Sequence, residues 1–313
     1  MALNRICVLG GSGFVGQHIV RLLAAQGLNV VVPTRHRERA REDLIVLPTV
    51  DVVACNVHDP AQLAQRVAGM DAVINLVGVL HGGHGENSFA TAHVELARKV
   101  VAACRDAGVP RLLHMSALNA GAESRSVYLR TKGEAETVVR DSGLQWTIFR
   151  PSVMFGPGDG FLNLFAGLLR RLPVMPLGSP QARFQPVYVE DVAATFVTSL
   201  DRLECHGRSY DLCGPKVYTL RELVERVGQW IGKPRPVIGL SDRLSYLQAL
   251  GLELLPVKLL TRDNYYSMLI DSVCQCEYPL GRTPQPLEAI APLYLADQGP
   301  RSRYQQFRNR AGR

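Results

Sequence analysis

Short apolar runs alternate with amphipathic stretches along the first half of the chain. The apolar runs predict buried strands at Ile6–Leu9, Val30–Pro33, Val50–Ala54, Ala72–Val77, Arg111–Met115 and Trp146–Phe149. The stretches between them predict helices, each followed directly by glycine, at Val15–Gln26, Pro60–Ala68, Ala92–Ala107 and Lys132–Ser142. Strands and helices in this alternation predict an α/β fold, with a doubly wound parallel sheet of the Rossmann type.

The pattern becomes less regular after residue 150. A glycine-rich loop at 156–160 comes first. The following stretches predict a helix at Phe161–Leu172, a strand at Phe184–Val192, a helix at 219–231 capped by Thr219, and a mostly helical, apolar segment at 243–295.

These patterns predict how the chain is divided. Residues 1–150 form the dinucleotide-binding domain, to which a segment at about 184–214 returns. Residues 151–183 and 215–298 form a smaller, mostly helical region that faces the substrate or a partner. Residues 299–313 form a basic tail that we expect to be disordered.

The net charge of +7 comes mainly from that tail, where five arginines occur without an acidic residue. The rest of the chain is close to neutral. Such a tail can touch an anionic membrane surface. No basic helix face with interleaved aromatic residues accompanies it, so we expect no nucleic-acid binding.

The cysteines and the N-terminus indicate the compartment. The seven cysteines are scattered, an arrangement typical of reduced thiols in the cytoplasm. Cys274 and Cys276 resemble a metal or redox pair, but no second pair supports this. Because a strand begins at Ile6, we expect no signal or transit peptide, and no apolar run predicts a membrane-spanning helix.

A glycine-rich loop follows the first strand and opens the first helix. Glycines allow a tight turn and close approach to a pyrophosphate, and the helix N-terminus offers free N–H groups. We therefore expect cofactor contacts from Gly10, Gly11, Ser12, Gly13, Phe14, Val15 and Gly16.

The end of the second strand bears on the choice of nucleotide. NAD-binding proteins usually have an acidic residue there, whereas this chain has Arg35 and Arg37. NADP(H) is therefore favoured over NAD(H), with Arg35 as the better candidate for a 2′-phosphate contact. The alternative is that both arginines are merely solvated, since Arg39 and Arg41 follow. Other strand ends predict cofactor contacts at Asn56, Val57, Leu76, Val77, Gly78, Pro151, Ser152 and Val153.

Tyr128 and Lys132 lie four residues apart and share one face of a predicted helix. A tyrosine can serve as acid or base in hydride transfer if a neighbouring cation lowers its pKa, and Lys132 can supply that charge and bind the nicotinamide ribose. Ser116, at the end of the fifth strand, is the candidate that orients the substrate oxygen. Ser124 and Ser126 are its rivals, and no metal site is predicted.

Together these segments resemble atypical short-chain dehydrogenases/reductases of the NAD-dependent epimerase/dehydratase-like group. The shared positions are Gly10–Gly16, Asn75–Gly78, Ser116, Tyr128 with Lys132, Arg150-Pro151 and Tyr188–Val192. A narrower set is similar to the nucleotide-binding accessory subunits of respiratory complex I and their bacterial relatives: His114–Ala120, Tyr128–Lys132, Phe161–Asn163 and Gln185–Val189. This resemblance runs from about residue 4 to residue 295.

The resemblance implies a Rossmann fold with bound NADPH and an association with complex I or quinone metabolism. In the complex I subunits the nucleotide is structural. The chain departs from active members at His93, which replaces an asparagine of the proton relay, although histidine can also relay protons. His81 and His84 resemble a metal pair but lack a third ligand, which favours an active-site loop.

Two functions follow from these features. The first is an NADP(H)-dependent oxidoreductase, or an enzyme of the epimerase/dehydratase-like kind, that acts on a small carbonyl or hydroxyl substrate, either quinone-like or a nucleotide sugar. The second is a non-catalytic NADPH-binding accessory protein, located in the cytoplasm or peripheral to the inner membrane. It would dock on a respiratory complex through its basic tail and the apolar segment Leu247–Leu260, for which a core helix is the alternative.

Overall fold

The computed structural model describes residues 3–44, 46–254 and 260–296. The basic tail and part of the segment Leu247–Leu260 lie outside these residues. None of the helices within the described ranges is long and apolar enough to cross a membrane.

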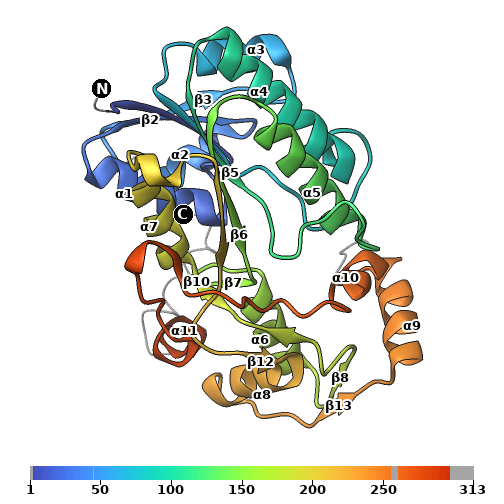
Figure 1. Ribbon diagram of the computed structural model, residues 1–313. Helices are drawn as coiled ribbons and strands as arrows, with labels where there is room; N and C mark the ends of the chain where they lie inside the picture. Colours follow the sequence, from blue (N-terminus) through green and yellow to red (C-terminus); the bar gives the residue numbers. More distant parts are fainter. Residues whose placement is uncertain (1–2, 45, 255–259, 297–313) are drawn as a thin grey trace.

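A seven-stranded parallel sheet lies at the centre of the molecule (Figure 1). Its order is β11-β6-β5-β4-β1-β2-β3. The strands are β1 (Arg5–Leu9), β2 (Asn29–Thr34), β3 (Val50–Ala54), β4 (Ala72–Asn75), β5 (Arg111–Met115), β6 (Gln145–Pro151) and β11 (Arg208–Leu212). The order reverses between β1 and β4, which opens the crevice where such sheets bind ligands. The predicted fold class is confirmed.

Helices cover both faces of this sheet (Figure 1). One layer contains α1 (Phe14–Ala25), α2 (Arg37–Leu44) and α7 (Val189–Ser199); the other contains α3 (Pro60–Val67), α4 (Leu96–Asp106) and α5 (Val127–Arg140). Alternate residues of β1 supply the two cores: Ile6 and Val8 pack with α1 and α7, whereas Cys7 and Leu9 pack with α3 and α4. This period of two makes the strand apolar throughout.

The chain after β6 builds a further apolar cluster below the sheet (Figure 1). Its core includes Phe155, Leu162, Leu169, Leu223 and Val227. The remaining elements after β6 are β7 (Met154–Phe155), α6 (Phe161–Arg171), β8 (Met175–Leu177), β9 (Arg183–Phe184), β10 (Val187–Tyr188), β12 (Tyr218–Thr219), α8 (Leu220–Trp230), β13 (Val237–Gly239), α9 (Asp242–Glu253), α10 (Arg262–Ser267) and α11 (Leu287–Leu295), with short 3₁₀ turns at Leu203–Cys205 and Pro279–Gly281. A 3₁₀ turn at Gly85–Asn87 and a π-helical turn at Ala90–Glu95 precede α4.

Some predicted elements differ from the structure. Phe184–Val192 is not one strand: β9 and β10 take its first part, and α7 begins at Val189. The buried residues Val189, Val192, Ala193 and Phe196 follow helical spacing, which prevails over the β-branched composition. Within the described part of 243–295 lie the helices α9, α10 and α11, and the predicted cap at Thr219 forms a capping box with Glu222.

The prediction that all thiols are reduced is wrong. Cys213, at the end of β11, forms a disulfide with Cys274, and their Cα atoms are 6.0 Å apart. The fold brings the two residues together across 61 positions, which sequence spacing does not reveal. Cys276, the other member of the suspected pair, is a free, exposed thiol.

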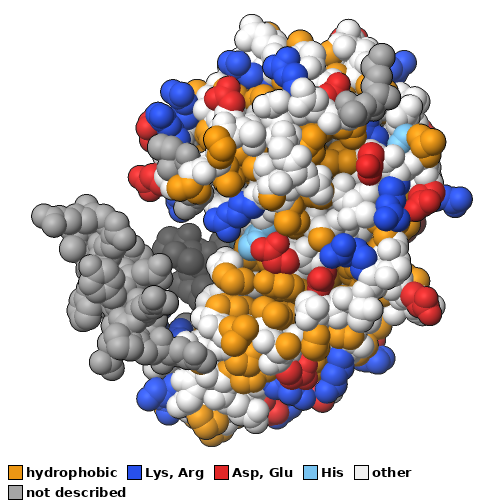
Figure 2. Space-filling model, turned by 90° about the vertical axis from the view of Figure 1, so that its left-hand side faces the viewer, with side chains coloured by type: hydrophobic (Ala, Val, Ile, Leu, Met, Phe, Trp, Pro, Cys, Tyr) orange, Lys and Arg blue, Asp and Glu red, His pale blue; other side chains and the backbone are white. Residues whose placement is uncertain are grey.

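One side of the molecule combines mixed charge with an apolar area (Figure 2). Basic and acidic side chains are interspersed over its upper part. Hydrophobic side chains gather on its lower part.

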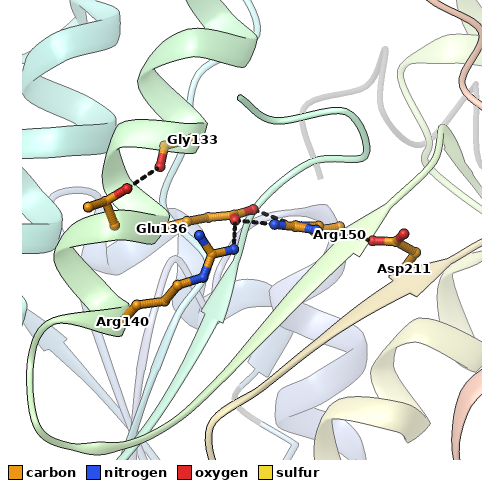
Figure 3. A network of polar contacts seen from close by, with 6 residues as sticks. Gly133, Glu136, Arg140, Arg150 and Asp211 are labelled. Carbon is orange, nitrogen blue, oxygen red and sulfur yellow. Dashed lines mark hydrogen bonds and ion pairs between the residues drawn. The ribbon is translucent and has the colours of Figure 1, made fainter. Parts of the chain in front are cut away.

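A buried carboxylate fastens α5 to the sheet (Figure 3). Glu136 is 1% exposed and accepts hydrogen bonds from Arg150 on β6, at 2.7 Å to Oε1 and 2.5 Å to Oε2. Arg140, one turn further along α5, donates to the same carboxylate at 2.6 Å. Asp211 on β11 lies 3.7 Å from the Arg150 guanidinium. The network therefore joins α5, β6 and β11.

We predict that Glu136→Ala lowers the free energy of unfolding by about 2–4 kcal/mol, because it leaves two arginines without their shared carboxylate. Chemical denaturation measures this change. Glu134→Ala is the matched control on the exposed face of α5, with an expected change within about 0.5 kcal/mol. Equal effects of both substitutions would contradict the assigned role of Glu136.

Candidate nucleotide and catalytic site

The turn from β1 into α1 requires glycine at two positions, Gly10 in the loop and Gly16 in the first turns of the helix. Gly10 adopts a φ of 79°, a left-handed conformation that favours glycine. A Cβ atom on Gly16 would lie 2.2 Å from the Gly10 carbonyl oxygen. No side chain caps the N-terminus of α1 at Gly13, so its first N–H groups face outward as a cradle for an anion.

Polar side chains meet beyond the ends of β2 and β3. Arg35 Nη1 lies 3.2 Å from Glu86 Oε2, and Asn56 donates from Nδ2 to Glu86 Oε1 at 2.9 Å. The hydrogen bond from Asn56 is the main cause that lowers the pKa of Glu86. Arg37 instead donates to the Val52 carbonyl at 3.0 Å. Arg35 and Asn56 thus lie together, and Glu86 is a residue that sequence reasoning missed.

The chain that follows β4 leaves space for the ammonium group of Lys132. Asn75 is buried and accepts a hydrogen bond from the N–H of Val77 at 3.2 Å, which fixes the turn into Gly78. A Cβ atom on Gly78 would lie 2.9 Å from Lys132 Nζ. Because Gly78 has no side chain, the ammonium group packs against the backbone where a cofactor ribose is expected.

Ser116 lies next to this ammonium group. Lys132 Nζ donates to the carbonyl of Met115 at 3.1 Å, and Ser116 follows directly in the chain. Ser116 is 3% exposed, and its Oγ has no hydrogen-bond partner among the described residues. A buried hydroxyl without a partner is costly unless a ligand supplies one. The same holds for Nε2 of the buried His114.

The rival serines are already engaged. Ser126 caps α5: its Oγ donates to Asp263 at 2.8 Å and accepts from the N–H of Leu129 at 3.3 Å. Ser124 accepts the N–H of Ser126 at 3.3 Å. Of the three candidates, Ser116 is the one whose Oγ is buried without a hydrogen-bond partner among the described residues.

Tyr128 lies in the first turn of α5, on the same side as His93, with their ring centroids 5.6 Å apart. Burial, and then the charge of Asp263, raises the pKa of Tyr128 to about 12. This differs from the expectation that Lys132 lowers that pKa. Lys132 is itself buried, which lowers its pKa to about 8 against the opposing charge of Glu136. Tyr128 is therefore a phenol at neutral pH.

His93 is held in one neutral form. Its Nε2 accepts the N–H of Val79 at 3.2 Å, so Nδ1 carries the proton and donates to Thr131 Oγ1 at 2.8 Å. Burial and the nearby charge of Lys132 lower its pKa to about 2. Both ring nitrogens are engaged with the protein, so His93 braces the loop after β4 against α5.

The three predicted contacts after β6 lie at the same edge of the sheet. Pro151 and Val153 accept backbone hydrogen bonds from Leu118 and Val187. Ser152 Oγ lies 2.9 Å from both the carbonyl oxygen and Oγ of Ser272. Its hydroxyl is therefore held by the C-terminal segment.

A hollow of about 320 Å³ opens beside Tyr128. It is lined by Gly82, Phe89, Arg125, Val127, Glu253, Thr261, Arg262, Asp263 and Tyr266. Phe89 connects it to the site, because its ring lies 6.0 Å from that of Tyr128. Sequence reasoning missed Phe89 and Asp263, which no local pattern marks. No three His, Cys, Asp or Glu side chains in the described ranges gather as metal ligands.

The fold, the glycine loop and its uncapped helix define a nucleotide-binding protein of the Rossmann type. Residues 10–160 match the model of the NAD(P)H-binding family.

Two curated relatives and one solved structure refine this assignment. NADH dehydrogenase (ubiquinone) 1 alpha subcomplex subunit 9 of Arabidopsis thaliana is 34% identical over 224 residues, 70% of this chain and 56% of the relative. Ceramide reductase of Caulobacter vibrioides is 33% identical over 196 residues, 61% of this chain and 59% of the relative. The chain thus spans less than two thirds of either. The dTDP-glucose 4,6-dehydratase DesIV of Streptomyces venezuelae has a TM-score of 0.65 at 24% identity, covering 77% of this chain and 85% of that one, and shows the shared fold. The predicted resemblance is confirmed.

The lowered pKa of Lys132 predicts a pH dependence of nucleotide binding. A protonated lysine donates charge-assisted hydrogen bonds to ribose hydroxyls, and this charge is lost as the pH rises through about 8. We expect the affinity for the nicotinamide dinucleotide to fall about tenfold between pH 6.5 and pH 9.5. Fluorescence titration measures it, with Lys132→Gln as the control that removes the transition. An unchanged affinity of the wild-type protein would contradict a role for this charge.

Proposed function

We propose that the protein is an NADP(H)-dependent oxidoreductase of the short-chain dehydrogenase/reductase type, which transfers hydride to or from a carbonyl or hydroxyl substrate. The observation that carries this proposal is the buried, unpartnered hydroxyl of Ser116 beside Lys132, at the end of β5. A structural serine would have its hydroxyl satisfied. A hydroxyl kept open next to a cation suits an incoming substrate oxygen.

Each side chain has a distinct role in this proposal. Bound NADPH supplies the hydride. Ser116 donates a hydrogen bond to the substrate carbonyl oxygen, and Tyr128 gives that oxygen its phenolic proton. Lys132 binds the nicotinamide ribose, and its positive charge stabilises the phenolate that remains on Tyr128. The glycine loop and the N-terminus of α1 hold the pyrophosphate.

The preference for NADP(H) rests on Arg35. No acidic residue ends β2, and the half-exposed Arg35 follows the strand. Arg35 and Asn56 both contact the carboxylate of Glu86. A guanidinium group suits a 2′-phosphate. The remaining cofactor contacts are those predicted at the strand ends, including Val57, Leu76, Val77 and Ser152.

The walls of the hollow bear on the substrate. Phe89, Val127 and Tyr266 offer apolar surface, whereas Arg125, Glu253, Arg262 and Asp263 bring charges of both signs. Arg262 and Glu253 pair with each other at 2.9 Å. The apolar wall, on the side of Tyr128, suits a carbonyl attached to an apolar, quinone-like or acyl group. The similarity to a ceramide reductase supports the same choice. The regions 151–183 and 215–298 then face the substrate, while 1–150 and 184–214 carry the nucleotide.

A second candidate function is that of an NADPH-binding accessory protein which docks peripherally on a respiratory membrane complex. The similarity to the complex I subunit supports it. Helix α9 also exposes Leu244 and Leu247, at 51% and 57%, as a surface for a partner. The nucleotide would then be retained rather than turned over.

The nucleotide that co-purifies with the protein, identified by mass after denaturation, separates these functions. We expect an empty site that binds NADPH reversibly, and Arg35→Ala should weaken NADPH at least about tenfold while changing NADH less than about threefold. Arg39→Ala, a neighbouring arginine of α2, is the control. Stoichiometric, tightly retained NADPH would favour the accessory protein, and a preference for NADH would overturn the role of Arg35.

We predict that Tyr128→Phe lowers kcat for the reduction of an apolar ketone by about 10²–10⁴-fold, because the proton donor is lost while the ring remains. The dissociation constant for NADPH should stay within about twofold of the wild-type value. Single-turnover oxidation of bound NADPH measures the first quantity and fluorescence titration the second. Undiminished turnover in this variant would remove Tyr128 from the mechanism.

A further inference from the structure

Glu86 reaches the adenosine end of the site from the loop that follows β4. Its carboxylate contacts Arg35 Nη1 at 3.2 Å through one oxygen and Asn56 Nδ2 at 2.9 Å through the other. These partners belong to two other strand ends, and Arg35 is the proposed contact of the 2′-phosphate. Glu86 therefore places a negative charge on the group that would bind a negative charge of the ligand.

The ion pair between Arg35 and Glu86 is weak enough for a phosphate group to replace the carboxylate. The side chains of Arg35 and Glu86 are 49% and 41% exposed, so water and salt weaken their ion pair. A phosphate monoester carries about −1.5 to −2 charges and three acceptor oxygens. It can therefore displace a single carboxylate from Arg35, but it works against the charge of Glu86 as long as that residue stays close.

Displacement of Glu86 would move the surface of the hollow. Glu86 lies in the 3₁₀ turn Gly85–Asn87, which is tied back by a hydrogen bond from Gly83 N–H to the Asn87 carbonyl at 2.9 Å. Gly82 and Phe89, on either side of this turn, line the hollow beside Tyr128. The same short loop thus touches both the adenosine end and the substrate end of the site.

We propose that Glu86 is a specificity-determining residue that competes with the 2′-phosphate for Arg35, so that NADP(H), but not NAD(H), releases the loop 81–89 when it binds. This inference rests on the proposed choice of NADP(H). In NAD-binding proteins, an acidic residue at the end of β2 binds the ribose 2′-hydroxyl. Glu86 has a different role in this proposal, because it repels the 2′-phosphate and does not bind the ribose hydroxyl. Loss of its charge should favour NADPH selectively.

Titration of the full chain with NADPH and NADH tests the competition. Glu86→Gln keeps the shape and the contact to Asn56 but removes the charge, and we expect it to tighten NADPH about three- to tenfold and to change NADH less than about twofold. Glu134→Gln, on the exposed face of α5, controls for the change in net charge. In the double variant Arg35→Ala/Glu86→Gln the gain should vanish relative to Arg35→Ala alone.

Hydrogen exchange supplies a second readout. Saturating NADPH should speed exchange of the amides of residues 81–89 in the wild-type protein, whereas saturating NADH should not. Equal affinities of the wild-type protein and Glu86→Gln for NADPH would overturn the inference, as would weakened NADH binding, which would make Glu86 a ribose contact. If Arg35→Ala leaves NADPH affinity unchanged, the proposed cofactor choice itself fails, and that result is distinct from a failure of Glu86 alone.

Discussion

Helix α5 holds Tyr128, Lys132 and Glu136 at intervals of four residues, and each is tied to a different part of the molecule. Glu136 binds Arg150 on β6, and Lys132 donates to the Met115 carbonyl on β5. At the helix N-terminus, Asp263 accepts the N–H of Val127 at 2.6 Å and that of Tyr128 at 3.2 Å. A carboxylate at this position interacts favourably with the helix dipole. The position of the candidate acid and cation is thus determined at both ends of the helix.

The burial that accompanies this anchoring shifts the pKa values of the anchored side chains away from their ordinary values. Burial lowers the pKa of Lys132 to about 8 and raises that of Tyr128 to about 12. It also leaves the Ser116 hydroxyl and His114 Nε2 without partners among the described residues. Natural proteins usually satisfy such groups, and they depart from this rule mainly at functional sites. Two such atoms, His114 Nε2 and Ser116 Oγ, lie close together in sequence at the carboxyl end of β5, which is also where the Lys132 ammonium group contacts the Met115 carbonyl.

Local patterns predict the nucleotide loop and the sheet strands from β1 to β6, but not the edge strand β11. The strand Ile6–Leu9, the glycines and the first helix are consecutive in the chain. The need for a tight turn that approaches a pyrophosphate closely is therefore visible in their spacing alone. Contacts between distant segments were not predictable in this way. Asp263 meets α5 across 136 positions at Val127, and Cys274 meets Cys213 across 61. Glu86 likewise lies on a loop with no distinctive pattern. Nothing in these residue types marks a pairing before the fold brings them together.

The electrostatics of Tyr128 also bear on the direction of the proposed reaction. A phenol that keeps its proton up to a pH of about 12 is ready to protonate the oxygen of a reduced carbonyl at neutral pH. Oxidation of an alcohol needs the phenolate, which burial and the charge of Asp263 disfavour. The Lys132 cation can offset this cost only once it is drawn toward the phenol from its contact with Met115. In the proposed reaction, the raised pKa of Tyr128 therefore favours reduction of a carbonyl over oxidation of an alcohol.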